Sequence, residues 1–249
     1  MGKAIGIIGG VGPYAGIDLV RKVFDNTIAV RDQEHIDLYM SSVPSIIGDR
    51  TNFLLHGGEN PAIGLYACFD KLATIGADVI AIPCNTAHAP PIYDEVAALG
   101  RTHWPDVLLL NMIEETVKVI KAHFAGGATI GLMATLGTHG QRIYQNHFTD
   151  EPSFSLIEPD QEGKEAVHRA IYDQGYGIKA TPSPSERARR VVKEQANLLI
   201  ERGADAIILG CTELPLALKA GEVSAHLFDP TEILARAAIA HVAQGKLRP

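Results

Sequence analysis

One short pattern occurs twice in this chain, and it constrains the fold more than any other feature. The segment GADVIAIPCNTAH covers residues 76–88, and GADAIILGCTELP covers residues 203–215. Each segment has Gly-Ala-Asp, then a short apolar run, then a cysteine that is followed within two residues by threonine. The two cysteines, Cys84 and Cys211, are 127 positions apart. This repeat indicates a chain built from two similar halves.

A second pair of segments supports the repeat. KAIGIIGGVG at residues 3–12 matches ATIGLMATLGT at residues 128–137, with Ile5 aligned to Ile130. The offset of 125 positions is close to the spacing of the cysteines. Strand and helix units therefore keep nearly the same spacing in both halves.

Apolar runs of strand length alternate with amphipathic stretches of helix length along the chain. The expected strands cover residues 4–10, 36–42, 78–83, 106–111, 128–135, 154–159, 205–210 and 226–230. The expected helices cover residues 13–30, 60–75, 113–123, 138–148, 162–174, 184–202 and 231–245. Strands that are apolar throughout are typical of a parallel sheet that is covered by helices on both faces.

These patterns predict an α/β fold made of two similar parallel-sheet halves with helices on both faces. The first half covers residues 1–112 and is completed by residues 227–249, and the second half covers residues 113–226. We expect a pseudo-twofold axis to relate the two halves. In open α/β sheets, ligands bind beyond the carboxyl ends of the strands. We therefore expect the active site in the cleft between the halves.

The composition argues against several classes of function. The chain of 249 residues has a formal net charge of −7, and a nucleic-acid partner would need a basic surface. No uninterrupted apolar run approaches about 18 residues, so we expect no membrane span. The ten histidines show no HxxxH pattern and no ligand spacing with cysteine, so we expect no metal. The three cysteines form no CxxC pair and the N-terminal segment lacks a signal peptide, which favours a reduced, cytoplasmic protein.

Cys84 and Cys211 each end an expected strand, so two facing halves would bring both thiols to opposite walls of one cleft. The residues that follow them, at the expected start of a helix, are Asn85, Thr86, Thr212 and Glu213. Backbone N–H groups at a helix start lower the pKa of a thiol and can hold a carboxylate. A buried, inert thiol is the alternative interpretation of a single cysteine, but the equivalent positions of the pair favour chemistry. Cys68 lies on an apolar helical pattern and is expected in the core.

The segment GIIGGVGPYAG contains Gly10-x-Gly12-x-x-Ala15, a relaxed form of the dinucleotide-binding fingerprint. Such a site would also need an acidic residue at the end of the second strand, where this chain has two serines. We interpret the segment as a tight loop that opens onto the cleft, with Gly12 near the substrate. Arg50 lies in the expected loop after the second strand, and its guanidinium is suited to bidentate binding of a carboxylate.

Four segments together resemble the aspartate/glutamate racemase family, and most closely its aspartate racemase branch. They are IGIIGGVGP at residues 5–13, GDRT at 48–51, PCNTAH at 83–88 and LGCTELP at 209–215. The resemblance implies racemisation without a cofactor, in which one thiolate removes the α-proton and the other thiol donates a proton to the opposite face. In glutamate racemases a histidine usually follows Cys-Thr, where this chain has Glu213.

The resemblance also assigns residues. It implies that Cys84 and Cys211 are catalytic and that Arg50 and Lys164 flank the side-chain carboxylate of the substrate. The other candidate substrate-binding residues are Gly12, Asn85, Thr86, Thr212 and Glu213. Family members are commonly dimers, so a homodimer is expected.

We predict a racemase that acts on aspartate, with glutamate as a further candidate substrate. One rival is a hydantoin racemase, or another racemase, isomerase or decarboxylase with the same cysteines. Arg50 and Lys164 disfavour a hydantoin, because it has no second carboxylate. A second rival is a non-catalytic relative that binds a small carboxylate, which the intact cysteine pair disfavours. A nicotinamide oxidoreductase is the least favoured alternative.

Overall fold

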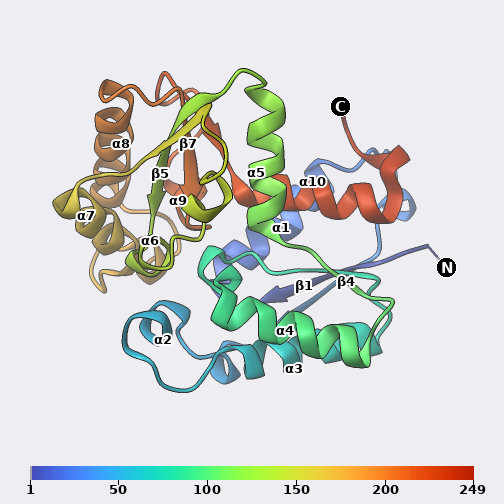
Figure 1. Ribbon diagram of the computed structural model, residues 1–249. Coiled ribbons are helices and arrows are strands. Elements are labelled where there is room, and N and C mark those ends of the chain that lie inside the picture. Colours follow the sequence, from blue (N-terminus) through green and yellow to red (C-terminus); the bar gives the residue numbers. More distant parts are fainter. Residues whose placement is uncertain (1) are drawn as a thin grey trace. The chain divides into compact units, whose positions relative to one another are not determined.

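The computed structural model describes residues 2–249 and divides into two compact units. Unit 1 comprises the chain up to Glu115 together with Thr231–Pro249, and unit 2 is Thr116–Pro230 (Figure 1). The sequence placed these boundaries after residue 112 and before residue 227. Unit 2 is therefore one continuous segment, whereas unit 1 is assembled from two segments that are distant in sequence.

Unit 1 is built around a parallel sheet of four strands in the order β2-β1-β3-β4. The strands are β1 (Ile5–Gly9), β2 (Leu38–Ser42), β3 (Val79–Ala81) and β4 (Leu108–Leu109). The helices are α1 (Pro13–Asp25), α2 (Arg50–His56), α3 (Ala62–Thr74), α4 (Pro90–His103), the start of α5 (Met112–His123) and α10 (Pro230–Ala243). All five residues of β1 are buried, as its apolar run requires of an inner strand.

Helix α10 brings the chain back to unit 1 and is joined there to the end of α1. The side-chain amide of Asn26 donates to Glu232 Oε1 at 2.7 Å, and its oxygen accepts from Arg236 Nη1 at 2.8 Å. The backbone N–H of Arg248 donates to the carbonyl oxygen of Asn26 at 2.9 Å. The early part of unit 1 is therefore completed by residues that follow the whole of unit 2.

Unit 2 repeats the same plan, with four parallel strands in the order β6-β5-β7-β8. The strands are β5 (Ala128–Ala134), β6 (Phe154–Ile157), β7 (Ala206–Gly210) and β8 (His226–Phe228). The main helices are α6 (Leu136–Gly140), α7 (Gln161–Tyr172), α8 (Glu186–Glu201) and α9 (Leu214–Ala217). The matching strand orders confirm the predicted α/β fold with two similar parallel sheets.

The strand orders also define which positions of the two units are equivalent. Strand β1 corresponds to β5, and β3 corresponds to β7. Cys84 follows β3 and Cys211 follows β7. Each cysteine therefore lies after the equivalent strand of its own unit, whereas Cys68 is fully buried in α3.

One expected helix is much shorter than its sequence pattern indicated. The helix expected over residues 138–148 is α6, which stops at Gly140. The chain continues through turns to a short 3-10 helix, η4 (Gln145–His147). Arg142, between the two, has φ 51° and lies in the left-handed region. A non-glycine residue rarely adopts this conformation.

The loop expected around Arg50 is instead the start of a helix. Arg50 is the first residue of α2, and Asp49 caps that helix by accepting a hydrogen bond from the N–H of Asn52 at 2.7 Å. Aspartate is a strong N-cap residue because its carboxylate satisfies an unpaired N–H group of the first turn. The sequence therefore carried a helix signal that the loop prediction overlooked.

The helices are of ordinary globular length. The longest, α8, has 16 residues, and a membrane-spanning helix needs about 20 apolar residues. Within residues 2–249, no helix combines the length and the apolar character that would let it cross a membrane.

Candidate active site

Cys84 lies shortly after β3, at the start of a buried 3-10 helix, η3 (Asn85–His88). Cys84 is only 5% exposed, and its sulfur lies 3.3 Å from Oγ1 of Thr86. His88 folds back so that its Nδ1 lies 2.9 Å from the carbonyl oxygen of Cys84. The turn after the strand therefore fixes the backbone of Cys84 and leaves its thiol beside a hydroxyl group.

His88 does not contribute a charge to this site at neutral pH. Burial lowers its pKa to about 4, and hydrogen bonds to the backbone of Cys84 and Leu110 oppose this shift only in part. Its ring stacks on that of Tyr93, with 5.0 Å between the ring centroids. The neutral imidazole therefore positions the backbone of Cys84.

The glycine loop after β1 lies at the same edge of the unit 1 sheet as Cys84, because β1 and β3 are parallel neighbours. Gly10 has φ 77° and Gly12 has φ 138°, conformations that favour glycine. Arg50 is 8% exposed and donates from Nη2 to the carbonyl oxygen of Val11 at 2.9 Å. Its Nη1 donates to a carbonyl oxygen just before α2, at 3.0 Å. Arg50 therefore ties α2 to the glycine loop.

Cys211 directly follows β7 and has a different environment. Its thiol donates to Oε2 of Glu213 at 3.0 Å, and the other carboxylate oxygen of Glu213 forms an ion pair with Lys179. Burial raises the pKa of the Cys211 thiol well above its usual range. The Glu213 carboxylate raises it further, and the charge of Lys179 opposes the shift. Cys211 is therefore a protonated thiol at neutral pH, hydrogen-bonded to a carboxylate.

The raised pKa of Cys211 differs from the expectation that a helix N-terminus lowers the pKa of this thiol. Helix α9, which follows Cys211, has four residues. One turn aligns few peptide dipoles, so its effect on a nearby thiol is small. For Cys211, burial and Glu213 outweigh that effect.

Sequence reasoning did not identify Lys179. This lysine lies in a short 3-10 helix, η5 (Ile178–Ala180), and its Nζ is 5.5 Å from the ring centroid of Tyr172. Burial alone would lower its pKa, but the charges of Glu213 and Cys211 outweigh burial and raise it above its ordinary value. Lys179 is therefore a fixed positive charge beside Cys211. The sequence feature that could have drawn attention to Lys179 is its place in the glycine-rich segment DQGYGIKA, which lies between two expected helices.

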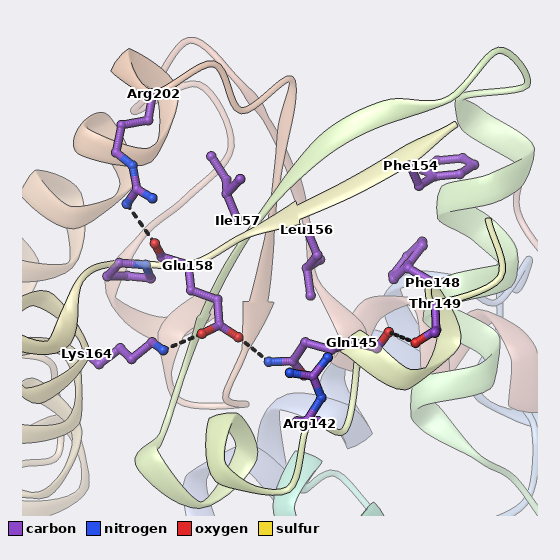
Figure 2. Close-up of a pocket in the computed structure, with 11 residues that line it drawn as sticks. Arg142, Gln145, Phe148, Thr149, Phe154, Leu156, Ile157, Glu158, Lys164 and Arg202 are labelled. Atoms are coloured by element: carbon purple, nitrogen blue, oxygen red, sulfur yellow. Dashed lines mark hydrogen bonds and ion pairs between the residues drawn. The ribbon is translucent and has the colours of Figure 1, made fainter. Parts of the chain in front are cut away.

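Lys164, which the family resemblance assigns to the side-chain carboxylate of the substrate, lies in a cluster around Glu158 and not in the one around Cys211. It lies on α7 and forms an ion pair with the carboxylate of Glu158 (Figure 2). Oε1 of Glu158 also lies 3.3 Å from Nδ1 of His139. Burial would raise the pKa of Glu158, but His139 and Lys164 outweigh it and lower the pKa to about 2. Lys179, and not Lys164, is the lysine that pairs with Glu213.

Glu158 is expected to stabilise the fold near neutral pH and to lose this contribution in acid. Its pKa is about 2 in the folded chain against an ordinary value of 4.5, so the unfolded chain takes up the proton first as the pH falls. The free energy of unfolding should therefore decrease from about pH 4.5 toward about pH 2. The contribution is at most about 3.4 kcal/mol, and solvent screening reduces it.

Urea unfolding of the wild type and of Glu158→Gln between about pH 6 and about pH 3 measures this contribution. The difference in stability between the two proteins should shrink as the pH falls. Glu201→Gln, a change at an exposed carboxylate at the end of α8, is the matched control. A difference that stays constant over the whole range contradicts the assignment.

Within residues 2–249, no cluster of three or more His, Cys, Asp or Glu side chains is placed to hold a metal ion. In the glycine loop, the carbonyl oxygen of Val11 accepts from Arg50. The thiols of Cys84 and Cys211 lie after strands at the carboxyl ends of the two sheets.

The fold and the cysteine after the equivalent strand of each unit are those of a two-unit α/β enzyme of the racemase class. The model of the Asp/Glu/hydantoin racemase family matches residues 8–238. The chain belongs to this family, and it is an isomerase with amino-acid racemase activity.

Individual relatives agree with this assignment. The chain is 29% identical over 248 residues to the broad specificity amino-acid racemase RacX of Bacillus subtilis, covering 94% of this chain and 96% of that one. The aspartate racemase of Picrophilus torridus superposes with a TM-score of 0.82 and 28% identity, over 100% and 96% of the two chains. An aspartate racemase homologue from Pyrococcus horikoshii OT3 gives a TM-score of 0.72 and 25% identity, over 97% and 99%.

A more distant structure shares the fold alone. The glutamate racemase of Francisella tularensis, solved in complex with D-glutamate, has a TM-score of 0.66 and 17% identity. The superposition covers 100% of this chain and 84% of that one.

Proposed function

We propose that this chain racemises aspartate without a cofactor, with Cys84 and Cys211 as the two bases and glutamate as a second substrate. The observation that carries the proposal is the placement of a buried cysteine after the equivalent strand of each unit. Racemisation inverts one carbon, so it needs a proton acceptor and a proton donor on opposite faces. Two units of one plan can supply one of each. Similarity to the aspartate racemase of Picrophilus torridus supports aspartate as the substrate.

We assign Cys211 to the L-enantiomer and Cys84 to the D-enantiomer. When D-aspartate binds, the Cys84 thiolate takes the α-proton and the Cys211 thiol donates its proton to the opposite face. L-aspartate needs the other form of the enzyme, in which Cys84 has taken up a proton from solvent and Cys211 has lost its own. The carboxylate of Glu213, 3.0 Å from its sulfur, is placed to accept that proton. The Cys211 thiolate then takes the α-proton, and Cys84 donates one.

Two polar contacts support this chemistry. Lys179 lowers the pKa of the Cys211 thiol, so its charge stabilises the thiolate when that forms. Oγ1 of Thr86 lies 3.3 Å from the sulfur of Cys84 and can donate to a thiolate there. Donors that are fixed before the reaction stabilise developing negative charge without reorganisation.

The substrate carboxylates are assigned to Arg50 and Lys179. Arg50 lies at the carboxyl edge of the unit 1 sheet, next to the glycine loop, and Lys179 lies beside Cys211 in unit 2. A guanidinium has five N–H donors, so one side chain can hold both the loop and a carboxylate. Lys164 is not assigned to a substrate carboxylate, because it already forms an ion pair with the carboxylate of Glu158.

Replacing Arg50 should weaken catalysis on aspartate. A charge-assisted hydrogen bond contributes roughly 1.5–3 kcal/mol, so Arg50→Ala should lower kcat/KM for aspartate by roughly 10- to 150-fold. Arg50→Lys should restore only part of the activity, because lysine lacks the planar fork. Arg21→Ala, a change at an exposed arginine on α1, is the control. Normal turnover by Arg50→Ala would remove the main support for a dicarboxylate substrate.

The proposed function is tested with purified protein in heavy water. L-aspartate, L-glutamate, L-lysine and a substituted hydantoin are incubated separately, and optical rotation and the α-proton signal are followed together. Aspartate should lose its optical signal and its α-proton at matched rates, and activity should survive dialysis and a metal chelator. Turnover of the hydantoin alone would favour the rival racemase, and no turnover of any substrate would favour a binding protein. Restoration of activity by added pyridoxal phosphate after dialysis would refute cofactor independence.

We also propose that the protein is a homodimer in the cytoplasm that binds neither nucleic acid nor membrane. The dimer is carried over from the family resemblance, and the net charge of −7 disfavours nucleic acid. Light scattering of the purified chain over a range of concentrations measures the assembly state directly.

A further inference from the structure

A pocket of about 620 Å³ lies in unit 2 beside the edge strand β6, and neither Cys211 nor Glu213 lines it (Figure 2). One end carries the side chains of Phe148 and Phe154, whose ring centroids lie 5.6 Å apart. Charged side chains lie farther along the lining. Pockets of about 300–1,000 Å³ with apolar walls and a few fixed polar groups are typical of sites for small organic molecules.

The lining of the pocket has an excess of positive charge. Arg142, Lys164 and Arg202 contribute to it, against one carboxylate, that of Glu158. Lys164 forms an ion pair with that carboxylate, and Arg202 Nη1 donates to the carbonyl oxygen of Glu158 at 2.7 Å. Both arginine charges are left without a carboxylate partner inside the pocket. This local excess stands out in a chain whose net charge is −7.

Arg142 is the most informative of these residues. Its guanidinium makes no hydrogen bond or ion pair with any other side chain described between residues 2 and 249, and it extends into the pocket (Figure 2). Its backbone has φ 51°, a conformation that glycine adopts freely and that costs other residues free energy. Backbone strain of this kind is often kept where a side chain serves a function. The guanidinium is therefore the reason to keep an arginine at a position that suits glycine.

We propose that this pocket binds a small organic anion that has a carboxylate or phosphate head and an apolar body. The head is bound by Arg142, since a guanidinium group pairs with either oxyanion through two parallel hydrogen bonds. The apolar body packs against Phe148 and Phe154. This site is separate from the racemase chemistry proposed for Cys84 and Cys211.

Calorimetric titration of the full chain with phenylacetate, phenyl phosphate and benzylamine tests the proposal. The three probes share an aromatic ring and differ in the charge and geometry of the head. Phenylacetate or phenyl phosphate should bind saturably, and comparison of the two identifies the preferred head. Benzylamine should bind at least tenfold more weakly. Binding of benzylamine as tight as that of either anion, or no saturable binding of any probe, overturns the proposal.

Arg142→Gly provides the decisive variant, because it removes the guanidinium and also relieves the backbone strain. It should fold at least as well as the wild type in a thermal melt and bind the preferred anion about tenfold or more weakly. Arg190→Gln is the matched control, since Arg190 is exposed, pairs with Glu194 and lies about three helical turns before Arg202.

The separation of this pocket from the racemase site is tested in the same titrations. Saturating L-aspartate should leave the affinity for the anion unchanged, and Arg142→Gly should leave the racemisation rate unchanged. Unaltered anion binding by Arg142→Gly, or displacement of the anion by aspartate, refutes a separate site. A failure of the proposed racemase function would show instead in the rate assay, without any change in these titrations.

Discussion

Replacing either Cys84 or Cys211 with alanine is expected to abolish racemisation while leaving proton exchange on one face of the substrate. A positioned proton donor or acceptor contributes typically about 10²- to 10⁴-fold to rate, and a two-base inversion needs both. Cys84→Ala should still exchange the α-proton of L-aspartate slowly through Cys211. Cys211→Ala should exchange only the α-proton of D-aspartate. The measurement is the replacement of the α-proton by deuterium in heavy water, for both enantiomers with each variant.

Cys68→Ala is the matched control for these variants. Cys68 is fully buried in α3, so its replacement should lower stability and leave the ratio of the two exchange rates unchanged. Equal loss of exchange from both enantiomers in both single variants would refute separate roles for the two thiols. Full racemase activity in either variant would refute the two-cysteine mechanism itself.

Glu213 and Lys179 are expected to shift the ionisation of Cys211 in opposite directions. The Glu213 carboxylate raises the pKa of the Cys211 thiol, and the charge of Lys179 lowers it. Glu213→Gln should therefore lower that pKa, and Lys179→Met should raise it. Both changes should still slow racemisation by about 10²-fold or more, because one removes the acceptor for the thiol proton and the other removes the charge that stabilises the thiolate.

The ionisation is measured in a Cys68→Ala, Cys84→Ala background, in which Cys211 is the single thiol. Ultraviolet absorbance of the thiolate is followed as the pH is raised, and racemisation is measured separately in the chain with all three cysteines. Lys164→Met is the control, because Lys164 pairs with Glu158 and should leave the titration of Cys211 unchanged. A shift with Lys164→Met as large as that with Lys179→Met would reverse the assignment of the two lysines.

The repeat predicted the plan of the fold because it records which strands are equivalent. Four-stranded parallel sheets of the same order follow from two copies of one pattern, and Cys84 and Cys211 lie after corresponding strands. The strands could be predicted because the buried strands are apolar throughout. The early end of helix α6 could not be predicted, because its amphipathic pattern continues to residue 148 while the chain turns at Arg142.

The charges around Cys211 could not be derived from the sequence. Several lysines lie between β6 and β7, and sequence spacing does not show which one folds back onto Glu213. Lys164 lies on a regular helix, whereas Lys179 lies in an irregular segment whose path depends on tertiary packing. Glu213 was identified as a candidate, but its hydrogen bond to the thiol depends on side-chain geometry.

The path of the chain through the two units sets an order for folding during synthesis. Unit 2 is one uninterrupted segment, so it is available to fold as soon as it has left the ribosome. Unit 1 must wait, because Asn26 bonds to Glu232 and Arg236, which are made only after all of unit 2. The part translated first is thus the part that is completed last.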